Sequence, residues 1–257
     1  MSQDYSDENI LLGRNPVREA LRAGRPINKI LLAGGDSPPL RELGRLAREA
    51  GIPVQQVDRA KLDKMAGGLP HQGVIAFASV RDYVEVDEIL ARAGEKPFLV
   101  ILDEINDPHN LGAILRSADA AGVHGVVIPR RRSASLTPAV ARASAGAVEY
   151  VPVARVTNIV RTVESLKEKG IWIVGAHMEG QLYWKASLDG PLALVIGGEE
   201  KGLGRLVREK CDQLVSLPML GRVSSLNASV AAALLSYEVL RQRGRAQYER
   251  LSHRGRL

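Results

Sequence analysis

The chain has 257 residues, of which 45% are hydrophobic and 25% charged, the balance of a folded globular protein and not of a disordered one. It contains no run of about 18 apolar residues, and its N-terminus lacks a secretory signal. The single cysteine, Cys211, excludes an internal disulfide and a cysteine-rich zinc site, and the five histidines show no metal-ligand spacing. We therefore expect a cytoplasmic protein that has no membrane span and no metal.

The net charge is +6 and is unevenly distributed. Residues 97–257 hold the whole excess, with 21 Lys and Arg against 15 Asp and Glu. A basic surface favours polyanionic partners such as nucleic acid, although many basic proteins bind none. Aromatic residues make up only 4% of the chain, which argues against recognition of bases by a stacking platform.

Apolar runs alternate with helical patterns along the first 80 residues, as in α/β proteins. A turn and a helix with Asn15 as its N-cap and Pro16 at its first position come first. Strands are then predicted at 27–34, 52–57 and 73–80, and helices at 38–51 and 58–67. These elements predict a small βαβ-type layer that ends near residue 80.

The acidic, turn-rich stretch 81–96 is predicted to be a linker with one or two helical turns, and a second α/β unit starts at Pro97. Its strands are predicted at 98–104, 125–129, 149–153, 171–177, 192–198 and 213–219. Its helices are predicted at 108–122, 137–146, 158–170, 204–211 and 225–243. Because the strands that precede helices are continuous apolar runs, we expect a parallel sheet that is covered on both faces.

Three segments of this second unit follow strand ends, where open α/β sheets bind ligands. In the first, LDEINDPHNLGAILRSADA, an apolar stripe at i, i+3, i+4 and i+7 from Leu111 leaves Arg116 off the buried face. Arg116 is either a functional cation or an exposed partner of Asp119.

The second segment, LALVIGGEEKGLGRL, has four glycines in eight residues, which let a ligand approach the backbone. Its spacing is neither the Rossmann pattern nor the P-loop. Glu199 in this loop is either a functional carboxylate or a solvated charge. The third segment runs from VSLPMLG into a helix whose start offers Ser224, Ser225 and Asn227, either as site residues or only as N-caps.

Together the three segments resemble one family. N-L-G-x-x-x-R, I-G-x-E-x-x-G-L and L-P-M-x-G-x-x-x-S-L-N-A-S-V-A-A occur in this order in the SpoU, or TrmH-like, RNA ribose 2′-O-methyltransferases of the SPOUT superfamily. GRNPVREAL and HQGVIA extend the resemblance over nearly the whole chain. It is strongest to the two-domain bacterial members, which methylate guanosine in 23S ribosomal RNA.

The resemblance implies a C-terminal methyltransferase domain, residues 97–257, whose parallel sheet is threaded into a deep trefoil knot and which binds S-adenosyl-L-methionine. It implies that residues 1–80 are a small α/β domain, similar to certain ribosomal proteins, that binds the RNA substrate. It also implies a homodimer through the C-terminal domain, whose active site is completed across the interface. The Ala- and Leu-rich helix after Leu226 suits such an interface.

The same resemblance assigns site residues. Arg116 is the catalytic arginine, and it stabilises the developing alkoxide or clamps the adjacent phosphate. Glu199 orients Arg116 or accepts the proton. The positions implied for the catalytic site are Arg116, Asn110, Glu199, Ser225 and Asn227, and those for the cofactor are Gly197, Gly198, Leu217, Met219, Leu226 and Ala228. No metal is required.

Two rival hypotheses remain open from the sequence. One is an RNA-binding protein that kept the fold without catalysis, and the other is a methyltransferase of the same architecture that acts on adenosine. Two basic segments could contact phosphate in either case: Arg130–Arg132, and a tail with six arginines between Arg241 and Arg256.

Overall fold

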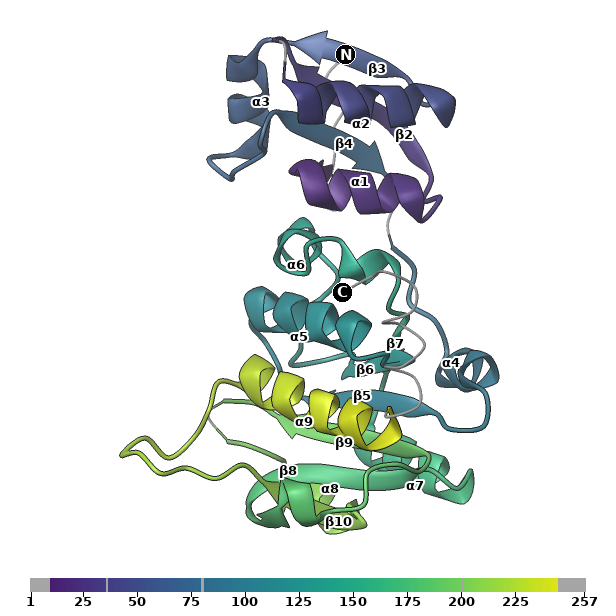
Figure 1. Cartoon of the computed structure of the whole chain (residues 1–257), viewed down its shortest axis with the longest axis vertical. Coiled ribbons are helices and arrows are strands. Elements are labelled where there is room, and N and C mark those ends of the chain that lie inside the picture. Colours follow the sequence, from purple (N-terminus) through teal and green to yellow (C-terminus); the bar gives the residue numbers. More distant parts are fainter. Residues whose placement is uncertain (1–9, 36, 80, 200, 245–257) are drawn as a thin grey trace. The chain divides into compact units, whose positions relative to one another are not determined.

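The computed structural model describes residues 10–35, 37–79, 81–199 and 201–244. They form two compact units, each of which draws on two parts of the sequence (Figure 1). Unit 1 comprises residues up to 82 together with 135–150, and unit 2 comprises residues 83–134 and those from 151 onward. Within the described ranges, no helix combines the length and apolar character that crossing a bilayer requires.

Unit 1 is built on a four-stranded sheet in the order β1-β4-β2-β3. Strands β2 and β3 are parallel, and β4 is antiparallel to both of its neighbours, so the layer is mixed. The strands are β1 (Ile10–Leu12), β2 (Ile27–Ala33), β3 (Val54–Val57) and β4 (Val74–Ala78), and the helices are α1 (Arg14–Arg22), α2 (Pro38–Glu49) and α3 (Arg59–Ala66).

The start of α1 differs from the prediction. The sequence favours Asn15 as the N-cap, whereas α1 begins at Arg14 directly after Gly13. Gly13 has φ +99°, a conformation that other residues rarely adopt, and it turns the chain sharply out of β1. The short strand β1, which was not predicted, uses the residues that precede this turn.

Residues 135–150 complete unit 1 with α6 (Pro138–Ala143) and the short helix η2 (Ala147–Glu149). Glu149 is buried, and its carboxylate pairs with Arg25 at 2.7 Å and with Arg81 at 3.4 Å. A buried carboxylate without partners is strongly unfavourable, so these ion pairs hold the segment in place. The strand predicted at 149–153 instead begins at Val153, because Glu149 turns inward to meet Arg25.

Unit 2 contains a six-stranded sheet in the order β10-β8-β9-β5-β6-β7, and every neighbouring pair is parallel. This confirms the predicted α/β fold with a parallel sheet. The carboxyl ends of the strands meet at one edge, where the three candidate segments emerge. The strands are β5 (Phe98–Asp103), β6 (Gly125–Pro129), β7 (Val153–Val156), β8 (Trp172–Leu182), β9 (Leu192–Gly197) and β10 (Gln213–Ser216).

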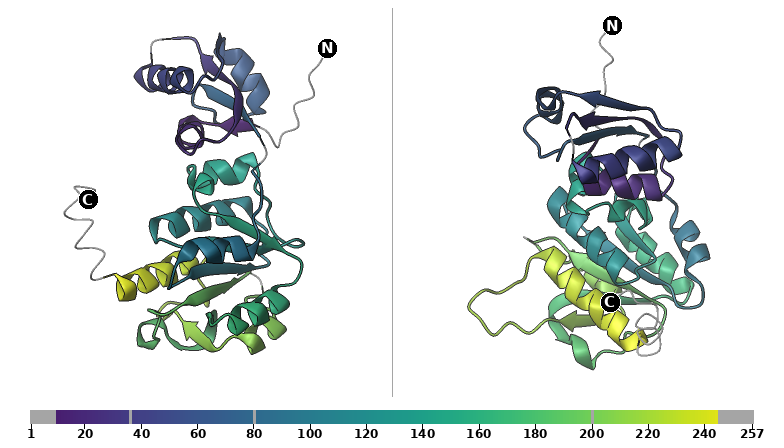
Figure 2. Two further views of the ribbon diagram at one scale, coloured as in Figure 1. Left: turned by 90° about the vertical axis from the view of Figure 1, so that its right-hand side faces the viewer. Right: turned by 45° about the horizontal axis from the view of Figure 1, so that its top comes forward.

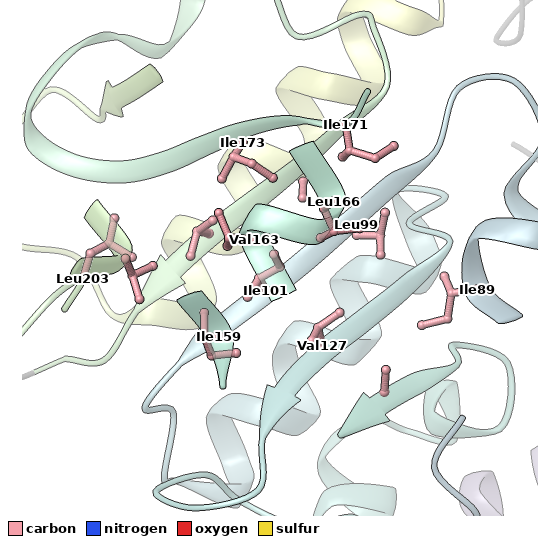
Figure 3. Close-up of a cluster of buried hydrophobic side chains, with 14 residues drawn as sticks. Ile89, Leu99, Ile101, Val127, Ile159, Val163, Leu166, Ile171, Ile173 and Leu203 are labelled. Carbon is pink, nitrogen blue, oxygen red and sulfur yellow. The ribbon is translucent and has the colours of Figure 1, made fainter. Parts of the chain in front are cut away.

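Helices cover both faces of this sheet. On one face α5 (Pro108–Ala120) lies beside α9 (Ala228–Arg243), as Figure 1 and the turned views of Figure 2 show. The other face packs against α4 (Val86–Ala93), α7 (Ile159–Glu168) and α8 (Arg205–Lys210). Figure 3 shows the core on this second face, to which β5 contributes Leu99 and Ile101 and α4 contributes Ile89. Burying each such side chain stabilises the fold by about 1.5–3 kcal/mol.

Residues 81–96 contain α4, which matches the expected helical turns, but from Tyr83 onward they pack within unit 2. A reciprocal capping box between Glu85 and Glu88 starts this helix. Ile89 is only 1% exposed, and a Cβ atom on Gly125 would lie 2.6 Å from its side chain, so the glycine makes room for it. The segment from Tyr83 onward therefore packs as part of unit 2.

The first two arginines of the predicted basic tail belong to α9. Arg241 donates to Glu238 at 2.8 Å, and Arg243 donates to the carbonyl oxygens of Lys96 and Pro97, each at 3.0 Å. These two side chains fix the end of α9, and the remaining tail arginines lie outside the described residues.

Candidate active site

A cavity of about 360 Å³ lies at the carboxyl edge of the unit 2 sheet, between β8, the ends of β9 and β10, and the start of α9. Its volume is within the range of small-molecule sites, about 300–1,000 Å³. The side chains and backbone that line it include all six residues implied for the cofactor: Gly197, Gly198, Leu217, Met219, Leu226 and Ala228. Glu199 and Ser225 also line it.

Three further lining residues come from β8: Ala176, His177 and Met178. No sequence motif singled out these three residues. Ala176 and His177 end the apolar run IWIVGAH and Met178 follows it, and the end of such a run is expected at the carboxyl edge of the same sheet.

The loop after β9 folds closely upon itself at this cavity. A Cβ atom on Gly197 would lie 2.1 Å from the carbonyl carbon of Gly202, and the Gly202 N–H donates to Gly198 O at 2.8 Å. The buried carboxylate of Asp103 accepts the Gly204 N–H at 2.8 Å and anchors the end of the loop. Burial raises the pKa of Asp103, and the Gly204 N–H partly offsets this rise.

Three of the predicted catalytic residues come together in a closed hydrogen-bonded triangle. Asn110 Nδ2 donates to Glu199 Oε1 at 2.9 Å, and Asn227 Nδ2 donates both to Asn110 Oδ1 at 2.9 Å and to Glu199 Oε1 at 2.5 Å. Asn110 is buried in α5, whereas Glu199 is exposed at the loop. The triangle therefore joins the ends of three separate chain segments.

The helix cap fixes which way each amide of the triangle faces. Asn227 is the N-cap of α9, and its Oδ1 accepts the backbone N–H groups of Ser229 at 2.9 Å and Val230 at 3.4 Å. Because backbone N–H groups only donate, Nδ2 of Asn227 must face Asn110 and Glu199. Oε1 of Glu199 thus receives two amide donors, and Oε2 is left for a further group. Asn227 is consequently both a helix cap and a member of the triangle.

Arg116 is not part of this triangle. It lies on the exposed surface of α5, and no hydrogen bond or ion pair of its guanidinium is seen within the described parts of the chain. It is six residues beyond Asn110, which places it about 120° around the helix and about 9 Å along it. The position off the buried face agrees with the apolar stripe, but the expected contact with Glu199 is not formed within one chain.

A second cavity of about 500 Å³ lies next to the first and shares Gly198, Glu199, Lys201 and Gly202 with it. Its other walls come from the segment after β5 and from Arg132 after β6. Both cavities therefore open on the carboxylate of Glu199. Among the residues in the described ranges, no group of three or more His, Cys, Asp or Glu side chains is placed to hold a metal ion.

Comparison with known families matches both parts of the chain. The SpoU rRNA Methylase family matches residues 97–237, and the domain described as RNA 2′-O ribose methyltransferase substrate binding matches residues 10–84. The first match alone spans the triangle, Arg116 and the residues that line both cavities.

Individual relatives agree with these matches. YacO of Bacillus subtilis (strain 168), assigned to the TrmH family of tRNA/rRNA methyltransferases, is 51% identical over 95% of this chain and 98% of its own length. The SpoU methyltransferase AviRb from Streptomyces viridochromogenes, solved in complex with AdoMet, is 29% identical, with a TM-score of 0.78 over 91% of this chain and 90% of its own. An AdoMet-bound rRNA methyltransferase from Sinorhizobium meliloti is 26% identical, with a TM-score of 0.77 over 91% of this chain and 87% of its own. The chain therefore belongs to the SpoU family and is an RNA ribose 2′-O-methyltransferase.

Proposed function

We propose that the protein transfers a methyl group from S-adenosyl-L-methionine to the ribose 2′-oxygen of a guanosine in 23S ribosomal RNA. The observation that carries this proposal is the Asn110–Glu199–Asn227 triangle, which orients one carboxylate at the junction of two cavities. A carboxylate held by two amide donors, with its second oxygen available, suits a hydroxyl group that must lose a proton.

The first cavity fits the cofactor in size and in chemistry. Leu217, Leu226 and Ile196 provide apolar surface for an adenine ring, while hydroxyl groups of Ser224 and Ser225 can bind a polar end. The negative charge of Glu199 complements a sulfonium group. S-adenosyl-L-methionine, when bound, supplies a methyl group that is activated by this sulfonium for in-line transfer.

The chain's own residues prepare the nucleophile. Asn110 and Asn227 hold Oε1 of Glu199, so that Oε2 can accept the proton that the ribose 2′-hydroxyl loses. The buried Asp103 keeps the loop that carries Glu199 in place through the Gly204 N–H. Ser225 lies where it can contact the ribose or the polar end of the cofactor.

Arg116 requires a different arrangement, because it does not reach this carboxylate within one chain. We infer that two chains pair through α5 and α9, and that Arg116 of one protomer enters the site of its partner. Val230, Leu234 and Tyr237 support this, since they form a partly exposed apolar stripe at i, i+4 and i+7 on α9. There the guanidinium can stabilise the developing alkoxide or the neighbouring phosphate.

Recognition of RNA is assigned to two surfaces. Residues 1–80 act as the substrate-binding domain, which the family match over residues 10–84 supports. Arg130 and Arg131 are exposed after β6 and can contact phosphate groups. We therefore expect RNA binding to weaken steeply as salt concentration rises.

Two measurements test the cofactor and the substrate of this proposal. Calorimetry with S-adenosyl-L-methionine in the presence of EDTA tests metal-free cofactor binding, and folded protein that binds none leaves the non-catalytic RNA-binding hypothesis ahead. Mapping of 2′-O-methyl groups in RNA from cells with and without the protein identifies the substrate. A mapped adenosine, or a site in another RNA, would replace guanosine or 23S ribosomal RNA in the proposal.

Two variants test the roles in catalysis. Glu199→Gln keeps the acceptor for both amides but removes the proton acceptor, so the turnover rate should fall by about 10²–10⁴-fold. Glu209→Gln, at an exposed carboxylate on α8 outside both cavities, is its control. Arg116→Ala should abolish transfer while cofactor affinity is retained, and exposed Arg161 on α7 provides the control Arg161→Ala.

Mixing the two inactive variants tests whether the site is shared. A heterodimer of Arg116→Ala with Glu199→Gln restores one complete site only if Arg116 acts in its partner's site. Random pairing in a symmetric dimer then recovers about a quarter of the wild-type activity. No recovery, in a mixture shown to contain heterodimers, would mean that both residues act within one chain.

A further inference from the structure

The second cavity contains one charged pair that the reaction as described does not use. Glu104 follows β5 and Arg132 follows the adjacent strand β6, and Arg132 Nη1 donates to Glu104 Oε1 at 2.8 Å. The pair lines the cavity beside Asn110 and Glu199. It is therefore next to the carboxylate that we assign to proton transfer.

Both members of the pair adopt a left-handed backbone conformation, with φ +62° at Glu104 and φ +57° at Arg132. Such a conformation is unfavourable for residues with a side chain, and it is concentrated at ligand-binding sites. The side chains are 35% and 73% exposed, and ion pairs this exposed contribute little to stability. The stability gained from this ion pair is therefore too small to explain why Glu104 and Arg132 both keep an unfavourable backbone conformation.

The backbone around the pair is held firmly. The Ala134 N–H donates to Ile105 O at 2.8 Å, which joins the segment after β6 to the segment after β5. A Cβ atom on Gly198 would lie 2.8 Å from Glu104 O, so the loop of Glu199 packs directly against Glu104. The two charged side chains are therefore presented at fixed positions on one wall of the cavity.

We propose that the second cavity holds the base of the target nucleotide and that Glu104 and Arg132 select guanine. This inference rests on the proposed function, because it places the base beside the ribose that is methylated. Along one edge, guanine presents two donors, N2–H and N1–H, followed by two acceptors, O6 and N7. A carboxylate accepts from the donors, and a guanidinium donates to O6 and N7, so the side-by-side pair matches this edge. Adenine has an unprotonated N1 and an amino group at C6, so it presents an acceptor and a donor where guanine presents the donor N1–H and the acceptor O6.

The test uses free nucleotides, so that it does not depend on knowing the RNA. Protein saturated with S-adenosylhomocysteine is titrated with guanosine, inosine and adenosine 5′-monophosphates, and binding is followed by NMR. Inosine monophosphate lacks only the N2 amino group and keeps N1–H, so it isolates the contact of the N2 amino group with Glu104. We expect guanosine monophosphate to bind about 5- to 150-fold more tightly than either competitor.

Two variants at the same position separate recognition from folding. Glu104→Gln should bring the affinities for guanosine and inosine monophosphates within about twofold, because a neutral amide cannot accept from both donors. Glu104→Gly should lose the same preference without loss of thermal stability, since glycine adopts φ +62° freely. Glu209→Gln breaks another exposed Glu–Arg pair, outside both cavities, and should retain the preference.

Equal affinity for all three nucleotides would overturn the inference, because it would mean that Arg132 and Lys201 bind only the phosphate. Absence of binding by any nucleotide, or a preference that survives in both Glu104 variants, would overturn it as well. The proposed function fails separately, if the protein binds neither S-adenosylhomocysteine nor S-adenosyl-L-methionine.

Discussion

The substitution Asn227→Asp separates the two tasks of this residue. Asp retains the Oδ1 atom that accepts the N–H groups of Ser229 and Val230, so the cap of α9 is preserved. It replaces the Nδ2 donor with a charged oxygen that faces Glu199 and Asn110 Oδ1. The variant therefore breaks the triangle and leaves the helix start intact.

The expected penalty follows from the distances. Asn227 Nδ2 lies 2.5 Å from Glu199 Oε1, so two carboxylates would face each other at about 3 Å after some relaxation, a repulsion of about 1.4 kcal/mol in water and about 5.5 kcal/mol at an effective dielectric constant of 20. Glu199 is exposed, which favours the lower part of this range. Rotation of the side chains reduces it further, so we expect a loss of about 1–3 kcal/mol in the free energy of unfolding at pH 8.

The pH dependence has a definite sign. The folded variant binds a proton between the two carboxylates more tightly than the unfolded chain does, so stability is regained as the pH falls from 8 to 5. Urea denaturation at both pH values measures this. Asn158→Asp is the matched control, because Asn158 caps α7 by accepting the Arg161 N–H at 3.2 Å and has no acidic partner in the described structure. Equal pH responses in the two variants would refute the orientation that we derive for the triangle.

Three further predictions follow from other parts of the molecule. Gly197→Ala should lower the free energy of unfolding by about 1–3 kcal/mol and weaken cofactor binding, because its Cβ atom would overlap the backbone of the loop. Gly190→Ala, at an open position, is the control, and its free energy of unfolding should stay within about 0.5 kcal/mol of the wild-type value in urea denaturation. Burial lowers the pKa of His124, so the unfolded chain binds the proton more tightly than the folded chain does. Stability should therefore be lost as the pH falls below about 6.5. His124→Asn should flatten this pH dependence of the free energy of unfolding, measured by denaturation from about pH 7 to 5. A fragment that lacks residues 1–82 should bind cofactor but be cut by protease within 135–150, because Glu149 loses both arginine partners; equal resistance of this segment in fragment and full chain would contradict its assignment to unit 1.

The elements of unit 2 could be predicted well because continuous apolar runs and helical stripes are local signals. Five of the six strands share at least half of their residues with the predicted runs, whereas β7 shares only Val153. The exception is β7, where Glu149 forms an ion pair with Arg25, 124 residues away. A local sequence pattern cannot indicate a partner that is so far away in the sequence. For the same reason, the sequence did not predict that residues 135–150 belong to unit 1.

Strand direction was harder to predict than strand position. The apolar residues of β4 read the same in either direction, so the sequence did not show that this strand runs antiparallel to both neighbours. The knot implied by the family resemblance stays a prediction for a related reason. Sheet order and register describe which strands are neighbours and not how the chain is threaded.

The site could be predicted only in part. The motifs placed Asn110, Glu199 and Asn227 at the carboxyl ends of parallel strands, so the topology alone brings them to one edge. Their hydrogen bonds cross 89 and 117 residues and needed the structure. Glu104 and Arg132 were missed as a pair because each only follows a strand, and a positive φ at a residue other than glycine leaves no mark in the sequence.

Arg116 shows how a correct local prediction can leave the function incomplete. The stripe on α5 predicted its exposure, and the structure agrees, yet the exposed side of that helix lies away from the triangle. Arg116 and Asn110 are about 120° apart around the axis of α5, so even a long side chain at position 116 starts from a different face of the helix than Asn110 does. This position supports the proposal that Arg116 acts on a site that another chain presents. The apolar stripe of α9 beside α5 offers a surface on which a second chain can pack, and the proposal therefore makes a dimer the active unit, which the mixing of inactive variants tests.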